Sequence, residues 1–211
     1  MTMSACICDT FLDLRTYLHV GIDFDYEAKL FFEELNLAKK ENDIQKYIKG
    51  NKKWYIPGSI LRGYDFGHHE AFIAPELQLG AEYKVDYALL GRNSIGYHMV
   101  LVEFEDVNVN YSIKSINTES KAVRAGITQI KDWKRWMDNN RHYFMNSYGL
   151  GEIAGSIPSW GIYYCLVVGR RSLMTQKDNE LRSQLQDELS GLKIISYDRI
   201  VDYIPALHNS F

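Results

Sequence analysis

The sequence predicts an α/β domain in which a mixed β-sheet is flanked by helices, and three observations support this. Two apolar runs, YKVDYALL and HMVLVEFED, are joined by the short Gly-bounded turn GRNSIG, the pattern of an antiparallel hairpin. A later run, GIYYCLVVG, is apolar, β-branched or aromatic and bounded by glycines, which is typical of a buried strand. Between these strands, residues 121–139 carry apolar side chains at steps of three and four, which predicts a long amphipathic helix.

The other elements complete this order. Residues 23–49 have helical periodicity with a polar break near residues 36–42, and Gly50 with Asn51 ends the second helix. We expect a first core strand within residues 63–77, a polar helix over 175–189, and a last strand and helix within 193–204. Residues 1–40 are assigned to an N-terminal extension or helical cap, and residues 41–211 to the main domain.

Composition limits the classes of protein. The chain has 211 residues, of which 46% are hydrophobic, enough for one folded domain with a substantial core. A net charge of −3 argues against indiscriminate binding of polyanions, although basic groups lining one groove would still permit DNA binding. The longest apolar run falls well short of 18 residues, so we expect no membrane span.

Three cysteines without a disulfide framework indicate a reducing, cytoplasmic location. Cys6 and Cys8 have no second pair with which to complete a tetrahedral zinc site.

Three acids within the hairpin are the strongest indication of chemistry. Alternate residues of a strand share a face, so Glu103 and Glu105 point the same way, roughly 6–7 Å apart. A hairpin centred between Ser94 and Ile95 sets Asp86 directly opposite Glu103, with Cβ atoms about 4.5–5.5 Å apart. That spacing suits two ligands of one divalent cation.

The alternative is that these acids are ordinary solvent-facing strand positions. Three like charges on one face repel each other, and Asp and Glu are poor strand formers. A hard cation bound by carboxylate oxygens removes that cost. The pattern therefore favours a Mg²⁺ or Mn²⁺ site.

An acid on one strand, then E-x-K on the next strand, then a helix, is the pattern of PD-(D/E)XK nucleases, which this arrangement resembles. Four blocks resemble more specifically the nuclease domain of Shedu anti-phage defence proteins: ENDIQKYIKGNKKWYIPG, VDYALL with VLVEFED, AGITQIKDWKRWM, and ISYDRIVDYI. The resemblance covers about residues 41–205. It implies a restriction-endonuclease-like PD-(D/E)XK core.

One residue departs from the family pattern. The third position of E-x-K is usually Lys, whereas this chain has Glu105. Some restriction enzymes with this fold carry Glu there. The change removes the usual group for polarising the attacking water and makes the site more acidic.

The resemblance implies further members of the site. Glu76 stands where the strand before Asp86 carries an acid and would complete the metal shell, and the carbonyl of Phe104 commonly supplies another ligand. Glu41 is the acid that the first core helix would offer; the alternative is a solvated acid favoured there by the helix dipole. Gln45 lies one turn further along that helix.

Gln129 and Trp133 are four residues apart and so share a helix face. The pair resembles the Q-x-x-x-Y motif of related nucleases, in which the Gln amide orients water or a phosphate oxygen. The alternative is a surface Gln beside a core Trp.

Basic residues outside the hairpin are weaker candidates for nucleic-acid binding. Lys52 and Lys53 precede Trp54, a combination that can bind a phosphate and stack a base but is equally common in solvated loops. Arg170 and Arg171 follow the last apolar run and can reach phosphate.

The acid pattern predicts a Mg²⁺ or Mn²⁺ site, and the resemblance implies that the protein is a metal-dependent DNA endonuclease that acts in anti-phage defence on phage or plasmid DNA. Asp86, Glu103, Glu105 and Gln129 are its expected catalytic residues. The resemblance also implies a homo-oligomer. Two alternatives remain open: a catalytically inactive nuclease-fold module that binds nucleic acid or a partner protein, and an acid-lined globular domain without a role on nucleic acid.

Overall fold

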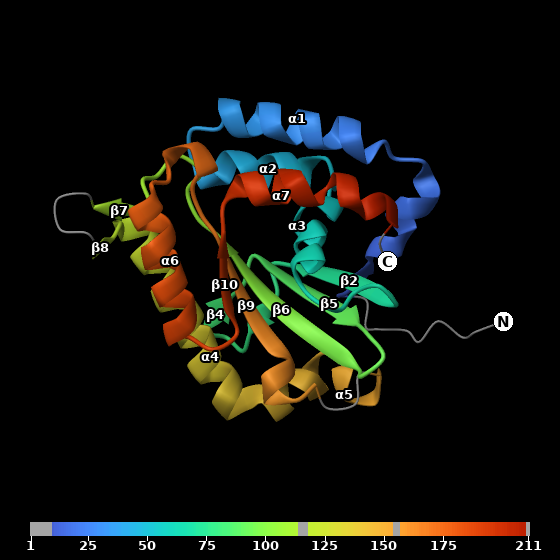
Figure 1. The fold of residues 1–211 in the computed structure, drawn as a ribbon. Helices are drawn as coiled ribbons and strands as arrows, with labels where there is room; N and C mark the ends of the chain where they lie inside the picture. The colour runs from blue at the N-terminus through green and yellow to red at the C-terminus, as the bar shows by residue number, and fades with distance from the viewer. Residues whose placement is uncertain (1–9, 114–117, 154–156, 210–211) are drawn as a thin grey trace.

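A six-stranded mixed sheet forms the centre of the computed structural model, which describes residues 10–113, 118–153 and 157–209 (Figure 1). Cys6 and Cys8 lie outside these residues. In spatial order the strands are β1 (Leu12–Asp13), β2 (Glu70–Pro75), β5 (Tyr87–Arg92), β6 (Tyr97–Phe104), β9 (Ile162–Val167) and β10 (Leu192–Ile195). The first four pair antiparallel, and β6, β9 and β10 pair parallel. The predicted mixed sheet is confirmed.

Two short hairpins lie outside this sheet. They are β3 (Gln78–Leu79) with β4 (Tyr83–Lys84), and β7 (Ser112–Ile113) with β8 (Thr118–Glu119).

Helices cover both faces of the sheet, as predicted. The α-helices are α1 (Phe24–Leu37), α2 (Glu41–Gly50), α3 (Tyr55–Gly58), α4 (Lys121–Ser147), α5 (Leu150–Ile153), α6 (Gln176–Glu188) and α7 (Tyr197–Tyr203). Short 3₁₀ helices are η1 (Leu14–Val20), η2 (Ser59–Gly63), η3 (Ser159–Gly161), η4 (Arg171–Leu173) and η5 (Pro205–Asn209). In Figure 1, α1, α2 and α7 lie over one face, and α4 crosses the other. None of the described helices is long and apolar enough to span a membrane.

The central strand β6 divides the apolar core into two layers. Its side chains are all buried, and they alternate between the faces of the sheet. Met99 and Leu101 join the cluster beneath α4, whereas Val100 and Val102 join the cluster beneath α2 and α7. Because β6 is buried on both sides, its middle residues 99–102 form a continuous apolar run, which is followed by Glu103 and Phe104.

The β5–β6 hairpin has the register that the sequence predicts. Tyr87 pairs with Val102 and Leu90 with Met99, so continuing the ladder by one step sets Asp86 opposite Glu103. The strands themselves are shorter than expected. Strand β5 begins one residue after Asp86, and β6 ends one residue before Glu105.

Helix α4 continues to Ser147, eight residues beyond the predicted end at residue 139. The side-chain amides of Asn139 and Asn140 donate to the carbonyls of Arg135 and Trp136, at 2.9 and 3.0 Å. The periodicity then resumes with the buried Phe144, so packing against the core sustains the last two turns.

Helix α1 packs against the domain. Phe24, Phe31 and Leu35 are buried in the same cluster as the α7 residue Ile200, and α1 contacts α7.

Candidate active site

Four carboxylates from separate segments gather near the end of β6. Asp86 precedes β5, Glu103 is the penultimate residue of β6, Glu105 follows that strand, and Glu41 is the first residue of α2. Their charges act on one another: after burial, the negative charges of Asp86, Glu105 and Glu41 are the main causes of the raised pKa of Glu103. The structure thus brings the three acids of the predicted hairpin site close to the helix acid.

Asp86 is held by the backbone of the strand opposite. Its carboxylate accepts a hydrogen bond of 2.8 Å from the N–H of Phe104. Burial raises the pKa of Asp86, and that hydrogen bond opposes the rise. Asp86 is half-buried.

Glu103 lies deepest in the group. It is 8% exposed, and its Oε2 has no hydrogen-bond partner among the described residues. A buried carboxylate without a partner strongly disfavours its charged form. The pKa of Glu103 is therefore well above the ordinary range of a carboxyl group, and the side chain keeps its proton unless a cation takes the place of that proton.

The backbone of Glu105 is fixed on both sides. Its N–H donates to the carbonyl of Val167 at 2.8 Å, and its own carbonyl accepts from the buried Tyr197 hydroxyl at 2.6 Å. Burial, followed by the charges of Asp86 and Asp106, raises the pKa of Glu105 to about 7 against the opposing effect of a hydrogen bond from the Asp106 backbone.

Helix α2 presents three polar side chains one turn apart: Glu41, Gln45 and Lys49. Burial, followed by the charges of Asp86 and Glu105, raises the pKa of Glu41 to about 7. Gln45 is 5% exposed; its Oε1 accepts from the Tyr87 hydroxyl at 2.6 Å, and its Nε2 has no partner among the described residues.

Lys49, at the end of that row, lowers the pKa of both Glu41 and Asp86. Its ammonium is therefore close enough to stabilise their negative charge.

Glu76 is placed differently from its neighbours. Its side chain is 48% exposed and forms ion pairs with Lys49 at 3.1 Å and Lys84 at 2.9 Å. Those two lysines, Lys84 first, lower its pKa. Its backbone N–H donates to the carbonyl of Asp86 at 2.8 Å, so Glu76 lies beside the site with its carboxylate paired to lysines. Its expected role as a metal ligand stays a prediction.

A cleft of about 860 Å³ opens beside the acids. It is lined by Glu41, Glu105 and Asp106, by residues 108–110, 112 and 113, and by the first turn of α4. Lys40 and Lys121 also line it, from the starts of α2 and α4. Half-buried acids and basic side chains therefore line the same cleft.

Gln129 and Trp133 lie on α4, whose Gly126 packs against Glu105. A Cβ added at Gly126 would stand 3.1 Å from Cγ of Glu105. Gln129 is half-buried one turn further on, whereas Trp133 is fully buried. Gln129 thus lies one turn beyond the glycine that packs against Glu105, and Trp133 lies in the core.

Two of the four basic residues that were expected to bind nucleic acid are buried or half-buried and form ion pairs within the protein. Lys53 pairs with Glu27 at 2.5 Å. Arg170 is 8% exposed and pairs with Asp198 at 3.1 Å.

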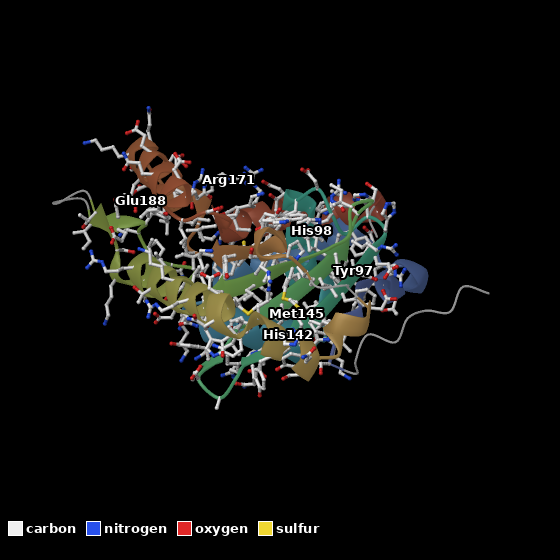
Figure 2. The ribbon with its side chains drawn as sticks, turned by 90° about the horizontal axis from the view of Figure 1, so that it is seen from below. Tyr97, His98, His142, Met145, Arg171 and Glu188 are labelled. Atoms are coloured by element: carbon white, nitrogen blue, oxygen red, sulfur yellow. The ribbon has the colours of Figure 1, made fainter. Side chains whose placement is uncertain are left out.

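The other two are exposed. Arg171, labelled in Figure 2, forms an ion pair with Asp202. Lys52 has a positive φ of 51°.

The donor set suits a hard divalent cation. Carboxylate and carbonyl oxygens are the ligands that Mg²⁺ and Mn²⁺ prefer, and the unpartnered Oε2 of Glu103 is the clearest vacant donor. The carboxylates do not form a closed trio. Among the described residues, the one group of three acidic, His or Cys side chains with ligand atoms mutually within 4.8 Å is Asp23, Asp25 and His208, all exposed and away from the cleft.

Sequence reasoning missed three contributors to this site. The positive charges of Lys49 and Lys84 lower the pKa of Asp86. The Tyr197 hydroxyl donates a hydrogen bond to the Glu105 carbonyl. Lys49 could have been found from its spacing, since it lies four residues after Gln45. Tyr197 is separated from Glu105 by 92 positions, and no local pattern links them.

A family model described as the C-terminal part of Shedu protein SduA matches residues 38–201. No curated protein matches the chain.

Proposed function

Because the chain belongs to the family of Shedu SduA C-terminal domains, we propose that it is a metal-dependent DNA endonuclease of the PD-(D/E)XK type that acts in anti-phage defence. The convergence of Asp86, Glu103 and Glu105 at one end of the β5–β6 hairpin carries this proposal. The order α2, β2, β5, β6, α4, β9 agrees with such a core.

The proposed metal ligands are Asp86, Glu103, the carbonyl of Phe104 and, more peripherally, Glu76. Bound Mg²⁺ or Mn²⁺ would supply the Lewis acidity that phosphodiester hydrolysis requires. The protein's own contribution is to hold oxygen donors that are costly to bury without a cation, as the raised pKa of Glu103 shows.

Glu105 is the proposed general base. With a pKa of about 7, its carboxylate is available near neutral pH and still basic enough to accept a proton from the attacking water. The two backbone hydrogen bonds on either side of its Cα limit its movement. Gln129 is proposed to orient the water or a phosphate oxygen.

Lys49 and Lys84 are proposed to supply the positive charge that the family places at position 105. Both lower the pKa of Asp86, so their field reaches the proposed ligands. Both lysines form an ion pair with Glu76, which holds their ammonium groups beside the site. A phosphate oxygen that entered there would meet the donors it prefers.

The cleft lined by Glu41 and Glu105 is the proposed path for DNA. Lys40 and Lys121 line its walls, where they would contact backbone phosphates without reading sequence. The homo-oligomer, the cytoplasmic location and the choice of phage or plasmid DNA stay predictions.

One observation favours the alternative of an inactive module that binds nucleic acid or a partner protein. Glu103 is 8% exposed and does not line the cleft. A carboxylate that a cation could not reach would bind Mn²⁺ poorly.

Plasmid cleavage with and without Mn²⁺ tests the proposal. The wild type should nick or linearise DNA only with the metal, Glu103→Ala should abolish cleavage, and Glu105→Ala should reduce its rate at least about 100-fold. Asp187→Ala, an exposed acid on α6, is the matched control and should cut like the wild type.

Calorimetric titration with Mn²⁺ separates the two functions. An endonuclease should bind the ion, and Glu103→Ala should bind it at least about 10-fold more weakly. A wild type that neither binds Mn²⁺ nor cuts single- or double-stranded DNA would exclude the endonuclease.

A further inference from the structure

A second cavity, of about 520 Å³, lies near the opposite end of β6. Its lining includes His98, the second residue of β6 and labelled in Figure 2. Glu103 is the seventh residue of that strand, so the two positions are separated by roughly 17 Å along the strand. The cavity shares no lining residue with the cleft beside the acids.

Four aromatic side chains line this cavity, and they come from segments far apart in the sequence. They are Tyr64, Phe66, Trp160 and Tyr163. Tyr64, Phe66 and Tyr163 pack against one another with ring centroids 5.2–5.4 Å apart. Flat, rigid walls of this kind select a planar ligand, because a ring stacks on them with little loss of conformational entropy.

His98 is the polar group within this aromatic wall. It is 4% exposed, and neither ring nitrogen has a hydrogen-bond partner among the described residues. Its ring is stacked on Phe66, with centroids 4.7 Å apart and planes inclined by 18°. Burial lowers its pKa, so near neutral pH the imidazole carries one N–H donor and one acceptor. Leaving such groups unpaired is unfavourable, and a ligand that paired with them would remove that penalty.

Trp160 forms the outer wall. Its side chain is 62% exposed, its ring centroid lies 5.8 Å from that of His98, and the two rings are inclined by 58°. Because the rings are tilted, the indole leaves the imidazole without a parallel stacking partner on that side. Rotation of the exposed indole would open a slot between these two rings.

Lys193 supplies the positive charge of this cavity, whose lining also includes the exposed acid Asp65. Its ammonium lies 4.3 Å from the centroid of the Tyr64 ring and donates to the carbonyl of Gly63. An ammonium has three donors, so one contact with a carbonyl leaves capacity for an anionic group on the ligand.

From this combination we infer that the cavity binds a nucleobase: a purine or pyrimidine ring stacked between Trp160 and His98, with its phosphate near Lys193. The aromatic ring faces favour a planar ligand. The imidazole favours a ligand whose edges can form hydrogen bonds. The positive charge of Lys193 favours a nucleotide over an uncharged ring. The base comes either from a free nucleotide or from an unpaired position in a nucleic-acid strand. This inference is independent of the acid site.

Tryptophan fluorescence and calorimetry test it, on the whole chain with EDTA present so that no cleavage intervenes. The ligands are the four ribonucleoside monophosphates, a single-stranded oligonucleotide, and the same oligonucleotide with abasic positions. Binding should change the emission of Trp160, which is far more exposed than Trp133 and Trp136. Monophosphates that bind alone identify a free nucleotide, and binding of the intact but not the abasic oligonucleotide identifies a base within a strand.

His98→Phe keeps an aromatic ring against Phe66 but removes both nitrogens, and it should weaken binding at least 10-fold while leaving the melting temperature near that of the wild type. Trp160→Ala should weaken binding similarly, whereas Tyr143→Ala, which removes an equally exposed aromatic side chain from α4, should have no effect. Three outcomes would each overturn the inference. They are equal affinity for intact and abasic oligonucleotides without binding of any monophosphate, no binding of any ligand at millimolar concentration, and unchanged binding by both cavity variants.

Discussion

Lys49 illustrates how a single side chain changes the interpretation of the acid at position 105. The sequence shows an acid where the family has Lys, which increases the negative charge of the site. The structure brings a lysine from α2 to the same acids. Position 105 therefore need not provide both the base and the positive charge.

Replacing Lys49 should separate catalysis from metal binding. If its ammonium meets the scissile phosphate, Lys49→Met should lower the cleavage rate at least about 10-fold. Affinity for Mn²⁺ should be unchanged or higher, because a positive charge leaves the vicinity of the carboxylates. Single-turnover cleavage and Mn²⁺ calorimetry measure the two effects.

Lys46→Met is the matched control, since Lys46 is an exposed lysine of the same helix. Equal cleavage by Lys49→Met and Lys46→Met would show that Lys49 only shapes the local charge.

At the level of elements, the contact between α4 and the sheet positions Glu105. Gly126 lets the helix approach closely: an added Cβ would stand 2.5 Å from Cδ1 of Leu166 and 3.1 Å from Cγ of Glu105. Leu166 is fully buried, so its side chain has little room to move. Any side chain at position 126 therefore pushes the helix away from β9 and disturbs Glu105.

Gly126→Ala should consequently destabilise the protein by about 1–3 kcal/mol, even though Ala is the better helix former. Cleavage should fall beyond what the lost stability explains, because Glu105 is displaced. Gly50→Ala is the control, since a Cβ there meets nothing within 4 Å. Urea unfolding compares the variants, and a stability equal to wild type in Gly126→Ala would contradict the close approach.

At the scale of the whole molecule, the acid cluster makes stability depend on pH. Glu41 and Glu105 have folded-state pKa values raised from about 4.5 to about 7. Between those values the folded protein binds more protons than the unfolded chain, so stability falls as pH rises. The stability associated with these groups is present at low pH and is lost as pH passes through about 7.

The metal-free protein should therefore melt at a lower temperature at pH 8 than at pH 5.5, and Glu105→Gln should reduce that difference. Mn²⁺ should raise the melting temperature more at pH 8, where the carboxylates are ionised and the ion binds only the folded state. Thermal scans in EDTA and in Mn²⁺ measure both effects. If the melting temperature depended on pH identically in the wild type and in Glu105→Gln, the pKa of Glu105 would not be raised in the folded protein.

The fold was largely predictable because its information is local. Strand alternation, helix periodicity and a short turn are properties of neighbouring residues, and they were sufficient for the mixed sheet and the hairpin register. The end of α4 was not predictable in this way. Asn139 and Asn140 look like a stop signal, but side-chain bonds to the preceding turn and the buried Phe144 carry the helix onward.

The sequence by itself determined the order of the elements, the pairing of Asp86 with Glu103 and the membership of the Shedu family, since each depends on adjacent residues or on motif order. Only the tertiary structure decided that α2 brings Glu41 and Lys49 to those acids, that Glu76 pairs with two lysines, and that Arg170 is held by Asp198. Those outcomes depend on which charges end up near one another after packing, and on how far burial removes each from water.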